Sequence, residues 1–309
     1  MNWHKLGWVF KPTAEYEWSK THAQVPFAFP LGDDKIRVFF STRDASSRSS
    51  VSFVDIDANN PTEVLYVHDK PCYQAGKLGY FDDSGTMPSW FIEQDGKILL
   101  YYTGWNTSKT ASYRLGIGLA ESIDGGLTFN RVYEGPLMDR SIYDPIWVGQ
   151  PCVLKHEGIW KMWYLSCVKI EYIDNHPEPF YDVKYATSED GIHWNRTGDV
   201  CIGLDDFTDA VGRPSVIIED GKYIMYYSYR NAKGYRADKG TRYRLGFAES
   251  EDGIHWTRRD AEIGIDKSAE GWDSEMITYP HAIKHNGKTM MFFNGNGFGA
   301  SGFGVAIEE

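Results

Sequence analysis

The chain has 309 residues, 42% of them hydrophobic and 15% aromatic, which supplies a packed core and excludes the disordered and fibrous classes. Its formal net charge is -11, and no Lys/Arg run suited to a phosphate backbone occurs, so we expect no nucleic-acid partner. No window of about 18 apolar residues is present, and the first residues are too polar for a signal peptide. We therefore expect a cytoplasmic protein without membrane association, whose four dispersed cysteines are buried free thiols.

The chain contains an internal repeat, in which a proline is followed by an apolar stretch, a polar turn and an aromatic run. The anchoring prolines are Pro26, Pro88, Pro151, Pro214 and Pro280, at steps of 62, 63, 63 and 66 residues. Within each unit, turns such as "DGK" and "NGK" separate the first two expected strands. Segments such as "RLGFAESED" then supply a third strand, and segments such as "GIHWTRRDA" a fourth.

Four short antiparallel strands in each unit, with no long amphipathic helix, are typical of propeller blades. The repeat predicts an all-β fold, a five-bladed β-propeller that forms a single domain over residues 1–309. The fifth unit ends at "GFGVAIEE", its third strand, while "MNWHKLGWVF" at the other end resembles a fourth strand. We therefore expect the amino-terminal strand to pair with the last blade and close the ring, which covers an exposed sheet edge.

The segment "SEDGIHW" occurs twice, at Ser188–Trp194 and Ser250–Trp256, and "SIDGGLTF" at 122–129 resembles it. Its Asp-Gly pairs fit tight turns between the third and fourth strands, and its tryptophans suit packing between sheets. "SIDGGLTF" also resembles the Asp-box of sialidases, a structural turn away from the active centre. We therefore predict a structural role for these repeated segments, and we expect the functional residues at positions where the repeats differ.

Acidic residues recur at matched positions before the anchoring prolines. Asp83, Asp209 and Glu275 lie five residues before the proline of their units, and Asp144 and Asp273 lie seven residues before it. On inner strands that surround one axis, such carboxylates would converge, and glycosidic bond cleavage uses a pair of carboxyl groups. We predict Asp83, Asp144, Asp273 and Glu275 as catalytic; the alternative is that each acid caps a turn.

Other residues near the strand ends suit a carbohydrate ligand. Aromatic faces such as those of Trp90, Trp105 and Trp147 can stack on a sugar ring, with core packing as the alternative. Arginines in "STRDASSRSS" and "YSYRNAKGYRADKGTRYR", among them Arg43, Arg230 and Arg236, are either solvated loop charges or ligands for phosphate or carboxylate. The predicted substrate-binding residues are Arg43, Asp44, Trp90, Trp105, Asp209, Arg213, Tyr279 and His281.

The chain resembles the five-bladed β-propeller glycosidase superfamily, which includes arabinanases, xylosidases, invertase-like enzymes and mannoside phosphorylases. The resemblance rests on the repeat count, the blade length and the "DG..W" hairpins, and covers essentially the whole chain. It extends to uncharacterised glycosidases of this fold, through "DDSGTMPSW", "GRP" and "GWDSEMITYP". The invertase-like motif "NDPNG" is absent, and of the arabinanase-type acids only Asp83 has a matching position, since unit three offers Asp144 where a Glu is expected.

The resemblance implies an enzyme that acts on a glycosidic bond of a small carbohydrate or glycoconjugate, with hydrolysis as the first hypothesis. A phosphorylase or glycosyltransferase of the same fold is one alternative, and a non-catalytic carbohydrate-binding propeller is another. No cofactor is expected; a divalent cation beside His281 is a minor alternative, suggested by arabinanase-like relatives. The sequence leaves the oligomeric state open.

Overall fold

The computed structural model describes residues 1–236, 238 and 241–309. The regular secondary structure of the described residues is almost entirely β-strand, and their helical segments are limited to η1 (Asp260–Glu262) and α1 (Asn296–Gly299). The expected all-β class is therefore confirmed. In the described ranges, no helix has the length and apolar character needed to cross a membrane.

The strands follow one another along the whole chain. In order they are β1 (Trp3–Phe10), β2 (Thr21–Pro30), β3 (Lys35–Arg43), β4 (Ser49–Asp57), β5 (Val64–Val67), β6 (Gly85–Gln94), β7 (Lys97–Thr107), β8 (Tyr113–Ser122), β9 (Asn130–Arg131), β10 (Trp147–His156), β11 (Ile159–Ile173), β12 (His176–Ser188), β13 (Asn195–Ile202), β14 (Ala210–Glu219), β15 (Lys222–Arg230), β16 (Arg244–Ser250), β17 (Thr257–Arg258), β18 (Thr278–His285), β19 (Lys288–Asn294) and β20 (Phe303–Glu308).

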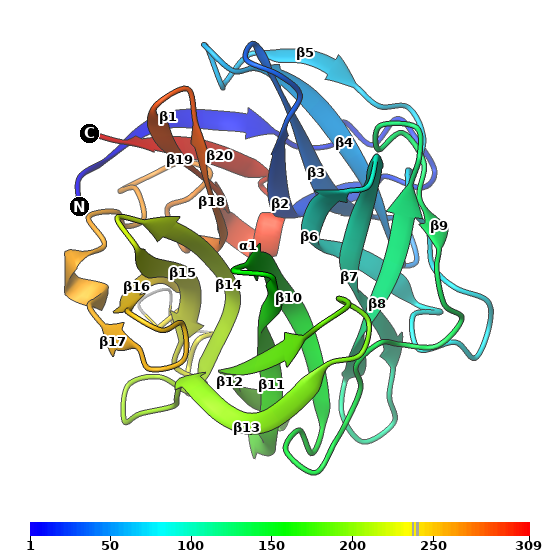
Figure 1. The fold of residues 1–309 in the computed structure, drawn as a ribbon, viewed down its shortest axis with the longest axis vertical. Coiled ribbons are helices and arrows are strands. Elements are labelled where there is room, and N and C mark those ends of the chain that lie inside the picture. The colour runs from blue at the N-terminus through cyan, green and yellow to red at the C-terminus, as the bar shows by residue number, and fades with distance from the viewer. Residues whose placement is uncertain (237, 239–240) are drawn as a thin grey trace.

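Neighbouring strands pair antiparallel in successive runs, β2 to β5, β6 to β9, β10 to β13 and β14 to β17. The run β18–β19–β20 is completed by β1, which pairs with β20 from Trp3 opposite Glu308 to Phe10 opposite Phe303. Single parallel bridges, between β4 and β6 and between β12 and β14, join neighbouring runs. Figure 1 shows the first strand of each run (β2, β6, β10, β14, β18) near the centre and the later strands toward the periphery.

The hydrophobic core lies between neighbouring runs. Phe40 of β3 packs with Phe303 of β20, and Trp3 of β1 packs edge-on against Tyr226 of β15 with ring centroids 5.7 Å apart. Apolar faces on both sides of each sheet explain the aromatic runs of the repeat, because each run packs against the runs on either side.

The two "SEDGIHW" copies form the turns that join β12 to β13 and β16 to β17. In each, the serine hydroxyl accepts the glycine N–H, and the first aspartate oxygen accepts two further backbone N–H groups. The carbonyls of Gly191 and Gly253 accept hydrogen bonds from Tyr101 Oη (2.9 Å) and Trp163 Nε1 (2.7 Å) of the preceding run. These repeated contacts fasten each run to its neighbour, as expected for a scaffold.

Candidate functional site

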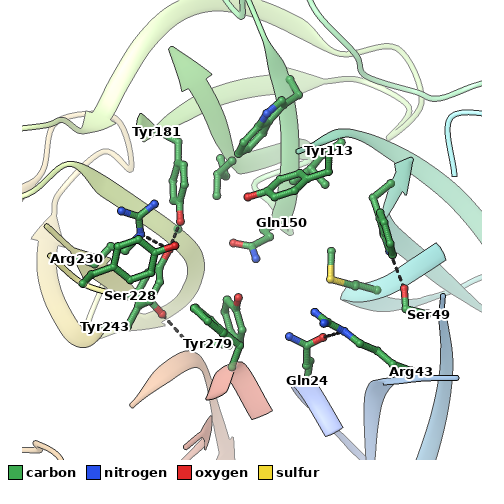
Figure 2. A pocket seen from close by; sticks show the side chains of 18 of the residues that line it. Gln24, Arg43, Ser49, Tyr113, Gln150, Tyr181, Ser228, Arg230, Tyr243 and Tyr279 are labelled. Atoms are coloured by element: carbon green, nitrogen blue, oxygen red, sulfur yellow. Dashed lines mark hydrogen bonds between the residues drawn. The ribbon is translucent and has the colours of Figure 1, made fainter. Parts of the chain in front are cut away.

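A cavity of about 390 Å³ opens where the inner strands begin (Figure 2). Every inner strand contributes to it the residue one or two positions before its anchoring proline: Gln24, Met87, Gln150, Gly212 and Tyr279. The other lining residues, most of them from the adjoining ends of the second and third strands, are Arg43, Ser47, Ser49, Trp105, Tyr113, Leu115, Trp147, Leu165, Tyr181, Ser228, Arg230, Tyr235, Arg236, Tyr243 and Phe298. The repeat therefore builds the cavity from equivalent positions that carry different side chains.

The backbone bends sharply at these positions. Gln150 and Tyr279 have φ of 47° and 55°, although each precedes a proline, and the strand register shifts at both places. Their N–H groups donate to side-chain oxygens on the preceding run, Gln150 to Thr103 Oγ1 and Tyr279 to Ser228 Oγ, both at 2.7 Å. Left-handed conformations of non-glycine residues are costly and cluster at functional sites, and here each bulge turns a side chain into the cavity.

Two arginines stand on opposite sides of the cavity (Figure 2). Arg43 is half-buried, and its Nε donates to Gln24 Oε1 at 3.0 Å. Arg230 is 3% exposed and donates from Nε to Tyr243 Oη at 3.2 Å and from Nη2 to the carbonyl of Pro179 at 3.2 Å. Burial lowers the pKa of Arg43, but an arginine side chain keeps its charge in water-accessible sites. The cavity is therefore cationic on both sides.

Tyrosines make up much of the remaining wall. The hydroxyls of Tyr181 and Tyr243 are hydrogen bonded to each other, and Tyr113 and Tyr279 face the same space (Figure 2). Burial raises the pKa of Tyr113, Tyr181 and Tyr279 above the ordinary tyrosine value. These phenols are therefore protonated at neutral pH, and they offer donors and ring faces to a ligand.

The structure places three of the predicted binding residues, Arg43, Trp105 and Tyr279, in the cavity wall. Trp105 is held there by a hydrogen bond from Nε1 to Ser49 Oγ at 2.7 Å. Trp147, the third candidate stacking residue, also lines the cavity. Trp90, by contrast, is 6% exposed and packs in the core, edge-on to Phe27.

Two of the predicted catalytic acids are buried in ion pairs away from the cavity lining. Asp144 has no exposed surface, and its Oδ2 lies 2.9 Å from Arg196 Nη1 of β13. Asp273 is 1% exposed, and its Oδ2 lies 2.6 Å from Lys5 Nζ of β1. Asp82, which the sequence analysis did not select, makes the equivalent pair with Arg131 of β9 at 2.7 Å. The recurrence of acids six or seven residues before the proline thus has a structural cause: Asp82, Asp144 and Asp273 each bind a cation on the outermost strand of their run.

The acids five residues before the proline lie in the loops that lead into the inner strands, and they are partly exposed. Asp83 accepts the N–H of Gly79 (2.9 Å) and Asp209 that of Ala232 (2.7 Å). Glu275 forms an ion pair with Arg242, whose guanidinium borders a second hollow that shares Tyr235, Arg236 and Phe298 with the cavity. None of these three acids lines the cavity, and Glu275 is connected to the neighbouring hollow through Arg242.

Three further residues that were predicted to bind substrate form hydrogen bonds with backbone groups instead. Arg213 is fully buried and donates to the carbonyls of Ser89 (2.5 Å) and Pro26 (3.3 Å), which links three inner strands, and burial lowers its pKa to about 10. His281 is 1% exposed, stacks on Phe27 with centroids 3.8 Å apart, and has Nε2 3.1 Å from the carbonyl of Ala28. Asp44 caps its own loop by accepting the N–H groups of Ser46 and Arg48.

The most important residue that the sequence analysis missed is Glu178 on β12. It is 2% exposed, pairs with Arg236, and has Oε2 3.6 Å from Arg230 Nη2. Glu178 is distant in sequence from Pro151, the anchoring proline of its run. The antiparallel pairing of β11 with β12 places it where it contacts Arg230 and Arg236. Gln150 and Tyr113 were also not selected. Gln150 directly precedes its anchoring proline, as the selected Tyr279 does, and this position was the signal that could have identified it. Among the described residues, no group of His, Cys, Asp or Glu is placed to hold a metal ion.

Comparisons with known proteins identify relatives and a shared fold. No family model matches the chain. Uncharacterized protein MT1551 of Mycobacterium tuberculosis (strain CDC 1551 / Oshkosh) and uncharacterized protein Rv1502 of Mycobacterium tuberculosis (strain ATCC 25618 / H37Rv) are each 35% identical over 312 residues, covering 100% of this chain and 100% of the relative.

Among solved structures, the RGII complex of BT0996 matches with a TM-score of 0.74 at 17% identity, covering 98% of this chain and 90% of the matched one. A structure from the GH130 family of mannoside phosphorylases, which contains glycoside hydrolases that target β-1,2 mannosidic linkages in Candida mannan, matches with a TM-score of 0.73 at 15% identity, covering 100% and 94%. A glycosyl hydrolase from Bacteroides ovatus gives 0.69 at 16% identity, covering 94% and 85%. The resemblance to the propeller glycosidases is confirmed at the level of the fold.

Proposed function

The chain belongs to the same family as the Mycobacterium tuberculosis proteins MT1551 and Rv1502, and we propose that it is a carbohydrate-active enzyme that cleaves or transfers a glycosidic bond. Its scaffold is a five-bladed β-propeller, in which each run of four antiparallel strands is one blade. The substrate is a small carbohydrate or glycoconjugate bound at the central mouth of the ring. The fold, which glycoside hydrolases and phosphorylases share, supports this proposal but does not specify the reaction.

The observation that carries the proposal is the composition of the cavity wall. Indole rings of Trp105 and Trp147 and the phenols of several tyrosines present flat apolar faces, and Gln24 and Gln150 add amide groups. Sugar rings are bound by this combination, because their C–H faces stack on aromatic rings while their hydroxyls need hydrogen-bonding partners. A volume of about 390 Å³ suits a ligand of one or two sugar rings.

Cleavage also needs a group that protonates the leaving oxygen and one that activates the acceptor. Glu275 and Asp83 are the predicted catalytic acids that remain partly exposed, on the loops that lead into inner strands, so we assign them the acid and base roles. Asp144 and Asp273 would instead act on stability, through their ion pairs. Hydrolysis and phosphorolysis differ in the acceptor, water or phosphate, and the same pair of carboxyl groups can serve either reaction.

Turnover of a panel of aryl glycosides, with and without orthophosphate, tests the proposal. Glu275→Gln and Asp83→Asn should each lower kcat by about 100-fold or more on any substrate that the wild type cleaves. Glu270→Gln, an exposed acid of the same loop as Glu275, is the matched control and should leave turnover unchanged. If both carboxyl variants retain wild-type turnover at unchanged stability, the assignment of these two acids is wrong.

A carbohydrate-binding propeller without catalysis is the second candidate. It is favoured by one feature: the described residues that line the cavity include no Asp or Glu. Saturable binding of a sugar, with no turnover in the presence of water or orthophosphate as acceptor, would support this function and contradict the enzymatic one.

A further inference from the structure

We infer that the cavity selects a carbohydrate ligand that carries an oxyanion, a carboxylate or a phosphate group, and that Arg43 is its principal ligand. This inference rests on the proposed function, since the same cavity would hold the sugar. It goes beyond that function by specifying the charge of the ligand.

Among the described residues, the cavity wall contains arginines and no carboxylates. Arg43, Arg230 and Arg236 contribute guanidinium groups to the wall. Within the described residues, Glu178 is the only carboxylate that forms an ion pair with any of them, with Arg236 and, at 3.6 Å, with Arg230. The cavity of a chain whose formal net charge is -11 is thus positive, and a site of this kind attracts anions.

Arg43 is held in the cavity wall by Gln24. In the described part of the structure, its side chain has a single hydrogen-bond partner, Gln24 Oε1, and no ion pair. That contact uses Nε, which leaves the two terminal nitrogens of the guanidinium facing the cavity. The neutral amide of Gln24 orients the side chain without cancelling its charge. A planar guanidinium fixed in this way can bind a carboxylate or phosphate through two parallel hydrogen bonds.

Arg230 forms part of the opposite wall of the cavity (Figure 2). Arg230 is 3% exposed, yet its Nη1 has no hydrogen-bond partner among the described residues. A buried unsatisfied guanidinium nitrogen is costly, and a ligand oxygen would relieve that cost. Gln150 and Tyr279 lie between the two arginines (Figure 2), where they can contact the sugar ring that carries the anion.

Titration calorimetry at low salt with matched pairs of ligands tests the inference. Methyl glycosides of glucose, galactose and mannose are compared with the corresponding uronates and 6-phosphates, and with orthophosphate alone. We expect at least one anionic sugar to bind about tenfold or more tightly than its neutral partner, with an affinity that falls as salt is added. Preference for uronates identifies a carboxylate ligand, and preference for phosphates or for orthophosphate alone identifies a phosphate.

Variants at Arg43 connect the preference to the site. Arg43→Gln should abolish the preference for anions, and Arg43→Lys should retain only part of it, because lysine keeps the charge but lacks the two-pronged geometry. Arg140→Gln removes an exposed arginine and should have no effect. Circular dichroism and thermal unfolding confirm that each variant is folded.

Two results would overturn the inference: equal affinity for neutral and anionic sugars, or no anion binding at about 10 mM ligand. A preference for anions that survives Arg43→Gln would overturn the role of Arg43. Turnover is measured separately on the same preparations. Anion binding without turnover would contradict the proposed enzyme alone, and turnover of neutral substrates without a preference for anions would contradict the oxyanion site alone.

Discussion

Oδ2 of Asp144 lies 2.9 Å from Nη1 of Arg196, in a place that leaves the aspartate without exposed surface. Tyr164 Oη donates to the same carboxylate, and Lys184 Nζ lies 3.7 Å from its Oδ1. The pair joins the loop before β10 to the outer strand β13 of the same run. The negative charge of Asp144 is balanced by Arg196 and Lys184, so this carboxylate should stabilise the fold.

Asp144→Asn should lower the free energy of unfolding by about 3 kcal/mol, because it leaves the partly buried Arg196 and the buried Lys184 without their anion. Urea denaturation measures the change. The double variant Asp144→Asn/Arg196→Met should recover part of the loss, since the guanidinium of Arg196 no longer lies unpaired, while Lys184 still lacks this carboxylate. Glu121→Gln, which breaks an exposed pair with Lys97, should cost at most about 1 kcal/mol. A loss of turnover without loss of stability in Asp144→Asn would instead place this acid in the reaction.

Asp182 should make stability depend on pH in the opposite sense to an ordinary aspartate. Burial raises its pKa to about 6, with Lys184 opposing and Asp144 adding to the shift, and its Oδ1 has no hydrogen-bond partner among the described residues. The folded state therefore holds the proton more tightly than the unfolded state. The stabilisation by this group is complete below about pH 4 and is lost as pH rises through about 6.

Asp182→Asn should accordingly be more stable than the wild type at pH 7 to 8, by roughly 1 to 3 kcal/mol, and the difference should vanish toward pH 4. Urea denaturation of both proteins from pH 4 to pH 8 measures the difference. Asp206→Asn, at an exposed aspartate, should show no such trend. A variant that is less stable at every pH would mean that Asp182 is ionised and favourably paired.

Trp3 on β1 should contribute to stability far more than Trp8 on the same strand. Trp3 is 7% exposed and packs against Tyr226, whereas Trp8 is 43% exposed. Trp3→Ala should lower the free energy of unfolding by about 3 to 5 kcal/mol, as expected for a large side chain removed from a core. Trp8→Ala should cause a much smaller change, and equal effects of the two variants in urea denaturation would contradict the packing of β1 described here.

Gly212→Ala should obstruct the cavity without unfolding the protein. A Cβ atom there would lie 2.8 Å from Cδ1 of Leu165 and 2.9 Å from Oε1 of Gln150, both ends of movable side chains. Displacement of Gln150 and loss of space in the cavity should weaken ligand binding by about tenfold, because one or two contacts with the ligand would be lost. Calorimetry with the ligand found for the wild type measures the effect, and unchanged affinity would show that the ligand does not reach this wall.

The repeat in the sequence was sufficient to predict the all-β class, the positions of the hairpins and the strand character of the amino terminus. These features depend on local chemistry: prolines, Asp-Gly turns and alternating apolar residues act within a few positions of themselves. The acids at matched positions could also be identified in the sequence, but whether each one is catalytic or forms a structural ion pair could not. Asp144 and Arg196 are 52 residues apart in the sequence, and nothing local indicates that they meet.

The repeating scaffold could therefore be predicted from local signals, because each unit carries the same ones. Which polar side chains are paired with an opposite charge, and which face the cavity, became known from the folded chain alone. Asp273 and Lys5, 268 residues apart, neutralise each other, whereas Arg43 keeps an uncompensated charge beside Gln24. Burial and charge pairing depend on side chains brought together from distant runs, and this is the physical reason that the candidate site had to be found in three dimensions.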